Sequence, residues 1–347
     1  MKLQVTPFTL HKRFALTISR GTTSESTNLW LRLHHDGSEG WGEASPFSIG
    51  TETQTTADVT AALDQIAPLL EPRSPLEGTA IEAAMQAVNL PSAARAALDI
   101  ARHDWIGKRL GIPLWKLWGG DRAQIPATSV TIGISRPDAA KARLLDWMET
   151  LTVRAIKIKL GSPDGIDADQ DMFTAVQSIA PPDAKISIDA NGGWSLTDAI
   201  TMAQWLSDRG VTYLEQPLAV EQDSDLPVLY ERSPLPIFVD ESCFTSRDIP
   251  ELSDRVHGIN IKLMKSGGLT EALRMVHTAQ ACGLQIMFGC YSDSCLANTA
   301  AAQLATFATH LDLDSHLNLT NDLFTGAIVE DGVLHPVDVP GLGVKKG

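Results

Sequence analysis

The chain has 347 residues, 44% hydrophobic and 20% charged, a composition typical of a soluble globular protein. Its formal net charge of −14 and the absence of basic runs argue against nucleic acid and anionic membrane surfaces as partners, and favour a small-molecule substrate. Polar or basic residues interrupt every apolar run near the N-terminus and the four cysteines are sparse, so we expect a cytoplasmic protein with reduced thiols, without a signal peptide.

The first 122 residues combine strand-like and helical patterns. The segments LQVTPFTL, FALTISR and NLWLRLHH alternate like antiparallel strands, and closely spaced glycines punctuate the turn that follows. Further along, SAARAALDIARHDWIGKRLG has a serine cap, helix-forming alanines and apolar residues at helical spacing, with Gly111 and Pro113 at its end. We therefore expect residues 1–122 to form a separate α+β domain.

From residue 123 to residue 320, short apolar or β-branched runs alternate with helical patterns. The eight runs are TSVTIGI, IKIKL, ISIDAN, TYLEQP, IFVDES, GINIKL, QIMFGC and HLDLD. This alternation is that of repeated strand, loop and helix units, and eight parallel strands close naturally into a barrel. We therefore expect an α/β fold with a TIM-type barrel, whose active site lies at the carboxyl ends of the strands. The tail, residues 321–347, is expected to return to the first domain.

Three acidic residues end consecutive runs: Asp189 in ISIDAN, Glu215 in TYLEQP and Asp240 in IFVDES. On the third, fourth and fifth strands of a barrel, these carboxylates would converge on one side of the mouth and suit a hard cation such as Mg²⁺. A single carboxylate at such a position could equally be a helix cap or a surface residue. The shared register on adjacent strands favours metal binding.

The second run, IKIKL, carries Lys157 and Lys159 on one face because strand side chains alternate. In an ordinary core each unpaired ammonium group would cost several kcal/mol, so this face is expected to line a polar site. Lys262 of the sixth run would lie across the barrel. Pairing with a nearby carboxylate at the core edge is the alternative for Lys159. Lys265 breaks the strand parity after Lys262 and is expected to face the loop.

Two opposed lysines beside a divalent cation suit removal of a weakly acidic proton next to a carboxylate or carbonyl group. The cation can stabilise the enolate, and a lysine can act as a base near neutral pH where burial, the cation and a like-charged neighbour lower its pKa. Return of a proton to the opposite face inverts the carbon centre. We expect Lys159 to be a base, and Lys157 to tune it or to contact the substrate carboxylate.

Five motifs follow one another along the chain: Lys-x-Lys, Asp-x-Asn, Glu-Gln-Pro, Asp-Glu-Ser and NIKLMKSGG. With ARAALDIARHDWIGKRLGIPLWKLWGG and GSEGWGEASP, they resemble the enolase superfamily over most of the chain, in particular its muconate-lactonising branch. The resemblance implies a modified (β/α)7β TIM barrel under an α+β capping domain. It also implies one Mg²⁺ ion on Asp189, Glu215 and Asp240, with Lys159 and Lys262 as the acid/base pair.

The eighth run, HLDLDSHLNL, places Asp312 and Asp314 on one face, where they could bind the α-ammonium group of a dipeptide. This Asp-x-Asp resembles the dipeptide epimerases of the branch, of the L-Ala-D/L-Glu epimerase type, and predicts a Mg-dependent isomerase. An acidic helix cap or loop is the alternative interpretation. The rival activities are those of an N-acylamino acid racemase, an o-succinylbenzoate synthase or a cycloisomerase of the same superfamily. A non-catalytic binding protein is disfavoured by the lysine and metal sets.

Further substrate contacts are expected from Arg20 in LTISRGT, from Thr131 on the first strand, and from the backbone at Cys290. A solvated loop arginine is the alternative for Arg20. No motif fixes the preferred side chains, for which alanyl-glutamate is the family-based default, or the oligomeric state, although a homo-oligomer fits this branch. Three further residues are expected to support the metal site and the lysines: Asn191, Glu241 and Asp293.

Overall fold

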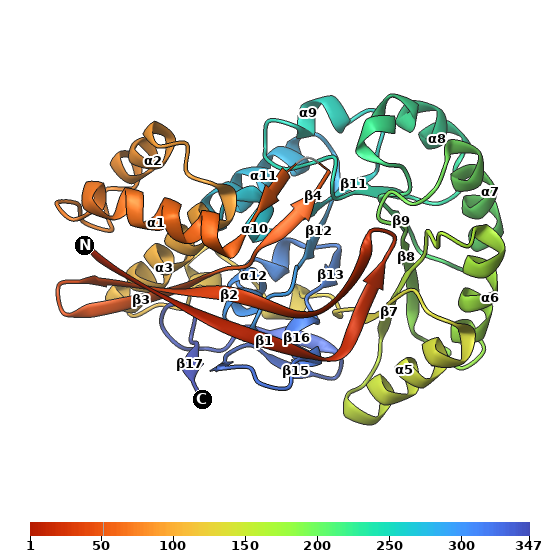
Figure 1. Cartoon of the computed structure of the whole chain (residues 1–347), viewed down its shortest axis with the longest axis horizontal. Helices are drawn as coiled ribbons and strands as arrows, with labels where there is room; N and C mark the ends of the chain where they lie inside the picture. Colours follow the sequence, from red (N-terminus) through yellow and green to blue (C-terminus); the bar gives the residue numbers. More distant parts are fainter. Residues whose placement is uncertain (51) are drawn as a thin grey trace.

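The computed structural model describes residues 1–50 and 52–347. They form an N-terminal sheet with helices, a parallel barrel beside it, and C-terminal segments in contact with both (Figure 1). No helix in the described ranges is long and apolar enough to cross a membrane.

The N-terminal sheet is antiparallel, in the order β1 (Lys2–Ile18), β2 (Gly21–His35) and β3 (Ser38–Ala44). The first two predicted strands are in fact one long strand, β1, whose register against β2 shifts between His11 and Leu16. The other elements of this region are β4 (Phe47–Ile49), β5 (Glu52–Gln54), α1 (Thr56–Leu70), α2 (Gly78–Ala87), α3 (Ser92–Leu110), α4 (Leu114–Leu117) and η1 (Arg122–Gln124).

Helix α3 packs directly on β3, and two glycines of that strand make the contact possible. A Cβ atom at Gly40 would lie 2.0 Å from the carbonyl oxygen of Ala101, and one at Gly42 would lie 2.0 Å from that of Ala97. The alanines of α3 and the glycines of β3 therefore let the two backbones approach more closely than larger side chains would allow.

The eight predicted runs all become parallel strands of one sheet. Their sequence order is also their order in the sheet, and a parallel bridge between Thr128 and Leu311 links the first and last strands into a nearly closed barrel. The expected TIM-type fold is thus confirmed. The strands are β6 (Val130–Ile132), β7 (Ala155–Lys159), β8 (Lys185–Asp189), β9 (Leu214–Glu215), β10 (Ile237–Val239), β11 (Gly258–Ile261), β12 (Gln285–Gly289) and β13 (His310–Asp312).

Helices cover the outside of the barrel between consecutive strands (Figure 1). Their buried faces are apolar, as in α6, where Met172, Phe173 and Val176 face inward. The helical segments are α5 (Pro137–Thr150), α6 (Ile166–Gln177), α7 (Leu196–Ser207), η2 (Val220–Asp225), α8 (Leu226–Arg232), α9 (Ile249–Leu252), α10 (Leu263–Ser266), α11 (Leu269–Ala281), α12 (Cys295–Ala302), η3 (Ala305–Phe307) and η4 (Ser315–Asn318).

After β13 the chain forms the short η4 and then a tail of short strands in place of a long helix. Phe324 of the tail packs edge-on against Phe8 and Trp30 of the N-terminal sheet. The division of the chain at residues 122 and 320 stays a prediction. The tail strands are β14 (Phe324–Thr325), β15 (Ile328–Glu330), β16 (Val333–His335) and β17 (Lys345–Lys346).

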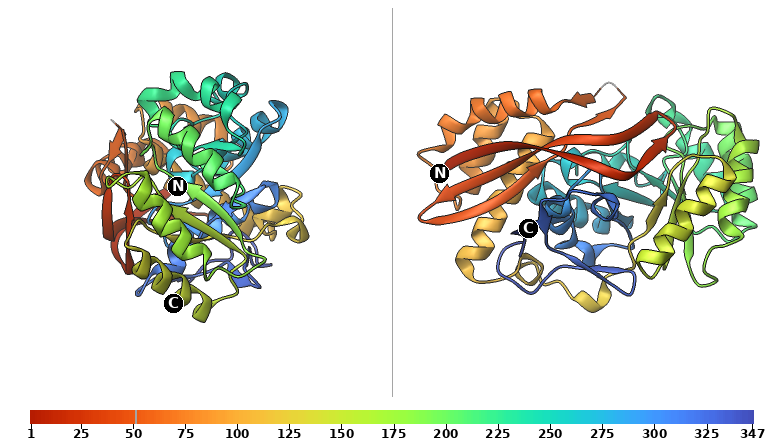
Figure 2. Two further views of the ribbon diagram at one scale, coloured as in Figure 1. Left: turned by 90° about the vertical axis from the view of Figure 1, so that its right-hand side faces the viewer. Right: turned by 60° about the horizontal axis from the view of Figure 1, so that its bottom comes forward.

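The hairpin of β1 and β2 extends from the N-terminal sheet toward the barrel strands (Figure 2). Asn318, which ends η4, exchanges two hydrogen bonds with the backbone of Phe14, at 3.1 and 2.8 Å. Near the hairpin tip, the Ser19 hydroxyl and the Arg20 guanidinium each donate to the backbone oxygen of Asn191, at 2.9 Å. The hairpin therefore crosses the carboxyl ends of the barrel strands and covers the predicted site.

Candidate active site

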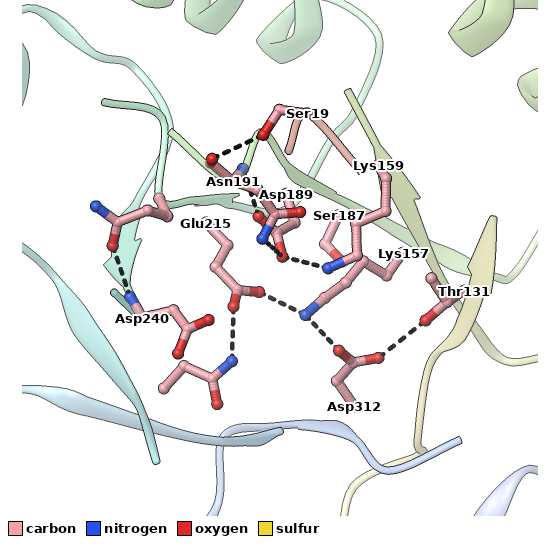
Figure 3. Close-up of polar contacts among 12 residues, drawn as sticks. Ser19, Thr131, Lys157, Lys159, Ser187, Asp189, Asn191, Glu215, Asp240 and Asp312 are labelled. Carbon is pink, nitrogen blue, oxygen red and sulfur yellow. Dashed lines mark hydrogen bonds and ion pairs between the residues drawn. The ribbon is translucent and has the colours of Figure 1, made fainter. Parts of the chain in front are cut away.

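The strand register places three predicted site residues in one row. Lys159 on β7 pairs with Asp189 on β8, and Asp189 pairs with Glu215 on β9. All three side chains are buried at the carboxyl ends of their strands (Figure 3). Asp240 follows β10 directly and Lys262 follows β11, so they continue the set around the barrel.

Each of the three carboxylates is paired with a lysine. The distances from Nζ to the carboxylate oxygen are 2.5 Å for Lys159 and Asp189, 2.5 Å for Lys157 and Glu215, and 2.7 Å for Lys262 and Asp240. Lys159 therefore does make the carboxylate pairing that was the alternative interpretation of this residue. That contact is compatible with a base, because Lys159 also lines an open pocket.

Lys157 is locked more tightly than Lys159. Its Nζ donates to Glu215 at 2.5 Å and to Asp312 at 2.6 Å, and no part of its side chain is exposed. Burial disfavours the ammonium form, but the charges of Asp312 and Glu215 outweigh burial and hold the pKa of Lys157 well above its ordinary value. Lys157 is thus a fixed cation between the predicted metal and ammonium sites.

The three predicted metal ligands lie close enough to repel one another. Burial, and then the charge of Asp189, raise the pKa of Glu215 to about 7. Burial also acts to raise the pKa of Asp240, but Lys262 and Lys265 outweigh it, so this pKa is well below its ordinary value. The lysine ammonium groups therefore supply the positive charge that these carboxylates need.

Within residues 1–50 and 52–347, no group of three His, Cys, Asp or Glu side chains is placed to hold a metal ion. The carboxylates turn toward lysines in place of a common centre. The donors nevertheless fit Mg²⁺ in kind, because carboxylate and amide oxygens are the ligands that it prefers. In the described part of the chain, three buried oxygens of this region accept no hydrogen bond: Asn191 Oδ1, Glu241 Oε2 and Asn260 Oδ1.

The prediction that Lys265 faces the loop is wrong. Only 1% of the residue is exposed, and its Nζ donates to the side chain and backbone oxygens of Asp240 and to the backbone oxygen of Asn260. Strand parity does not apply here, because β11 ends at Ile261 and helix α10 begins at Leu263. The helical turn brings Lys265 beneath Asp240.

Asp312 and Asp314 lie together at the end of β13. Ser129 Oγ donates to Asp312 at 2.8 Å, and the backbone N–H of Thr131 donates to Asp314 at 2.7 Å. Burial raises the pKa of Asp314 to about 6, assisted by the charge of Asp312. Burial also acts to raise the pKa of Asp312, but Lys157 and Lys159 outweigh it, so this pKa is lowered to about 2. Asp314 precedes η4 but makes no side-chain cap, which disfavours the helix-cap alternative.

A pocket of about 260 Å³ opens between the hairpin and the strand ends. Lys159, Asp312 and Asp314 line it, so one of the predicted bases and the predicted ammonium site share a single space. The rest of the lining combines apolar and polar side chains, with Arg143 and Lys12 as additional cations. The apolar wall residues include Phe14, Ala15, Leu16, Ile134, Ala139 and Trp147.

The remaining predicted contacts occupy two places. Thr131 and Cys290 line the pocket, where Thr131 Oγ1 donates to Asp312 at 3.3 Å and Cys290 Sγ donates to the Asp312 backbone oxygen at 3.2 Å. Arg20 lies outside this pocket and forms an ion pair with Glu241 at 2.7 Å. Its role as a substrate contact stays a prediction.

The three residues expected to support the site each contact a neighbouring group. Asn191 Nδ2 donates to Asp189 and to Glu241, both at 3.2 Å. Asp293 accepts from Ser45 Oγ of the N-terminal region at 2.5 Å. These contacts place Asn191 and Glu241 beside the predicted metal ligands, and Asp293 at the junction between the N-terminal region and the barrel.

Four residues near the site were not predicted from the sequence: Tyr291, Arg143, Lys12 and Asn260. The guanidinium of Arg143 lies between the rings of Phe14 and Trp147, 4.1 and 4.0 Å from their centroids. Asn260 Nδ2 donates to Glu215 at 2.6 Å. Asn260 carried a usable signal, since it lies two residues before Lys262 on the same strand face, whereas the other three had none in the periodic pattern.

Comparison with known proteins matches both parts of the chain to one superfamily. Residues 3–119 match the mandelate racemase / muconate lactonizing enzyme N-terminal domain, and residues 139–346 match the enolase C-terminal domain-like family. A hydrophobic dipeptide epimerase from Flavobacteria bacterium (strain MS024-2A) is 44% identical, over 99% of this chain and 97% of that protein. Another, from Roseobacter litoralis, is 43% identical, over 99% and 98%.

A solved structure agrees with these relatives. The dipeptide epimerase from Enterococcus faecalis V583, complexed with Mg and the dipeptide L-Leu-L-Tyr, is 29% identical, with a TM-score of 0.92 over 99% of this chain and 98% of that one. The expected enzyme class, an isomerase, is confirmed by these comparisons. The chain belongs to the mandelate racemase / muconate lactonizing enzyme branch of the enolase superfamily.

Proposed function

We propose that the protein is a Mg²⁺-dependent dipeptide epimerase, which inverts one Cα centre by removing a proton on one face and returning a proton to the other. The observation that carries this proposal is the pocket that joins Lys159 to the acidic pair Asp312 and Asp314. Lys262 follows the sixth strand and Lys159 ends the second, so the two amines come from different sides of the barrel, and Lys262 lies against Tyr291 of the pocket wall. The named activities of the relatives support the same reaction.

The acidic pair selects a substrate with a free amine. Two carboxylates on one pocket wall bind an ammonium group better than a neutral amide, because charge-assisted hydrogen bonds are about twice as strong as neutral ones. With the α-ammonium group at Asp312 and Asp314, the second residue of a dipeptide extends toward Lys159 and the row of carboxylates. The reacting Cα then lies near the lysines.

Lys159 and Lys262 exchange protons with the two faces of that Cα, while Lys157, buried between Glu215 and Asp312, acts on them as a fixed cation without touching the substrate. The proposed Mg²⁺ ligands are Asp189, Glu215 and Asp240. Mg²⁺ would supply electrostatic stabilisation of the charge that develops on the substrate carboxylate during proton removal.

The pocket walls favour apolar side chains on the dipeptide. Phe14, Leu16, Ile134 and Trp147 line the space next to the acidic pair, and the two relatives described above are named hydrophobic dipeptide epimerases. We therefore propose apolar dipeptides as substrates in place of the alanyl-glutamate default. A cytoplasmic location and assembly into a homo-oligomer stay predictions.

Deuterium uptake at Cα tests the proposal directly. The purified protein is incubated with Mg²⁺ in D₂O with a pool of L,L-dipeptides and, in parallel, a pool of N-succinyl amino acids, and the products are read by mass spectrometry. Mass gain in apolar dipeptides is the expected result. Gain only in the acylated pool would replace the epimerase with a racemase of N-acylated amino acids, and gain in neither pool would favour a cycloisomerase or lyase.

A further inference from the structure

Tyr291 lies over the second lysine of the predicted acid/base pair. The Nζ atom of Lys262 is 4.6 Å from the centroid of the Tyr291 ring, within the range of a cation–π contact. Tyr291 also lines the pocket that contains Lys159, Asp312 and Asp314. The ring therefore forms one wall of the pocket and lies beside the ammonium group of Lys262.

The N-terminal region fixes the position of this ring. Phe47 of β4 stacks on Tyr291, with ring centroids 5.0 Å apart and planes 11° from parallel. The backbone N–H of Tyr291 donates to Asp293 at 3.1 Å, and Asp293 accepts from Ser45 Oγ at 2.5 Å. Phe47 and Ser45 thus hold the segment after β12 from the N-terminal side, and Tyr291 passes that restraint on to Lys262.

The ring, and not the hydroxyl, makes this contact. Tyr291 Oη is buried and forms no hydrogen bond with any residue that the structure describes. Removing the hydroxyl therefore leaves the stacking on Phe47 and the contact with Lys262 intact. Phenylalanine at this position is a matched control for the loss of the ring.

We propose that Tyr291 is a positioning residue for Lys262, and that Phe47 and Tyr291 together form an aromatic bridge by which the N-terminal region sets the geometry of one base of the pair. This inference rests on the proposed epimerase function. Lys159 and Lys262 each pair with a carboxylate of the neighbouring strand, but among the residues that the structure describes only Lys262 also contacts an aromatic ring. The N-terminal region therefore supports one base of the pair through Tyr291 and not the other.

Misplacing Lys262 alone would affect the two epimers of the substrate differently, whereas a general loss of structure would slow both. When Lys262 donates, its N–H bond breaks and a C–H bond forms on one face of the substrate, and the electron pair stays on nitrogen. A misplaced Lys262 delays that return, so an epimer deprotonated by Lys159 recovers its proton from Lys159 more often. Exchange without inversion then rises for this epimer and falls for the other one.

The experiment measures both processes for both epimers of an active dipeptide in D₂O, exchange by mass spectrometry and inversion by chiral chromatography. For Tyr291→Leu we expect the ratio of exchange to inversion to change about tenfold, upward for one epimer and downward for the other, a size consistent with loss of a desolvated cation–π contact. Tyr291→Phe is expected to keep the wild-type ratios. Phe47→Leu is expected to shift both ratios in the directions seen for Tyr291→Leu, by a smaller factor.

Equal slowing of both epimers with unchanged ratios in Tyr291→Leu and Phe47→Leu would overturn the inference. So would a shift in Tyr291→Phe as large as that in Tyr291→Leu, because the hydroxyl would then be responsible. Absence of exchange in the wild-type protein with every dipeptide would refute the proposed function itself, together with this inference. The first two outcomes differ from this one because in them the wild-type protein is active.

Discussion

Asp314 is the sharper test of the ammonium site, because Asp312 also pairs with Lys157 and its loss would disturb that lysine. In Asp314→Asn the shape and the contact with the backbone N–H of Thr131 are kept, and only the charge is lost. A hydrogen bond to a charged group contributes about 1.5–3 kcal/mol, so we expect KM for a dipeptide to rise about 10- to 150-fold with a smaller change in kcat.

The pH dependence of kcat/KM provides an independent test of the Asp314 charge. The pKa of Asp314 is raised to about 6, so its carboxylate is present above pH 6 and lost as the pH falls through that value. For wild type, kcat/KM is therefore expected to decrease below pH 6 as ammonium binding weakens. In assays saturated with Mg²⁺, where the cation favours the charged form of Glu215, Asp314→Asn is expected to lose this acidic limb.

Initial rates of epimerisation by chiral chromatography between pH 5 and pH 8 provide the assay. Asp171→Asn, on an exposed position of α6, is the matched control and is expected to match wild type. An unchanged KM in Asp314→Asn would refute the assignment of Asp314 to the ammonium group. Retention of the acidic limb would refute the link between that limb and its carboxylate.

Lys159→Ala and Lys262→Ala are each expected to abolish inversion but to leave Cα exchange in one epimer only, a different epimer for each variant; exchange of both epimers in either variant would contradict the two-base arrangement. Chelation of divalent cations is expected to stop exchange, and added Mg²⁺ to restore it; full exchange by chelated protein would contradict the metal assignment. Lys157→Met leaves two buried carboxylates without their lysine and is expected to lower the free energy of unfolding in urea titrations by about 3–5 kcal/mol, more than Lys159→Met does. Equal losses in the two variants would contradict the different pairing of the two lysines. Gly42→Ala, whose Cβ would lie 2.0 Å from a carbonyl oxygen of α3, is expected to lower stability by at least about 1–3 kcal/mol in the same titrations, whereas Gly210→Ala, with open space around it but positive φ, is expected to lose only the cost of that φ.

The barrel was predictable from the sequence because each strand is a short apolar or β-branched run, separated from the next by a segment with helical spacing. All eight runs correspond to strands, and Asp189 and Glu215 fall in one row with Lys159 because parallel strands share an edge. The long strand β1 was not predicted as one element. Its register shift after His11 interrupts the alternation that a sequence pattern depends on.

The parts of the site that were missed come from contacts between distant segments. Arg143 lies on a barrel helix, and its place in the pocket depends on Phe14 of the hairpin. Tyr291 depends on Phe47, more than 200 residues earlier in the chain. No local period encodes such pairs, since they arise only when the hairpin and β4 pack over the strand ends.

Lys157 and Lys159 share one strand face, yet the fold gives them different chemistry. Lys157 is completely buried between two carboxylates from β9 and β13, so removing its proton would leave both charges uncompensated. Lys159 is 7% exposed and lines the pocket, and among the residues that the structure describes it forms an ion pair only with Asp189, a predicted metal ligand. A base must reach the substrate and lose its proton at a tolerable cost. The alternation of the strand brings both lysines to the site, and the number of carboxylates around each decides which one can be the base.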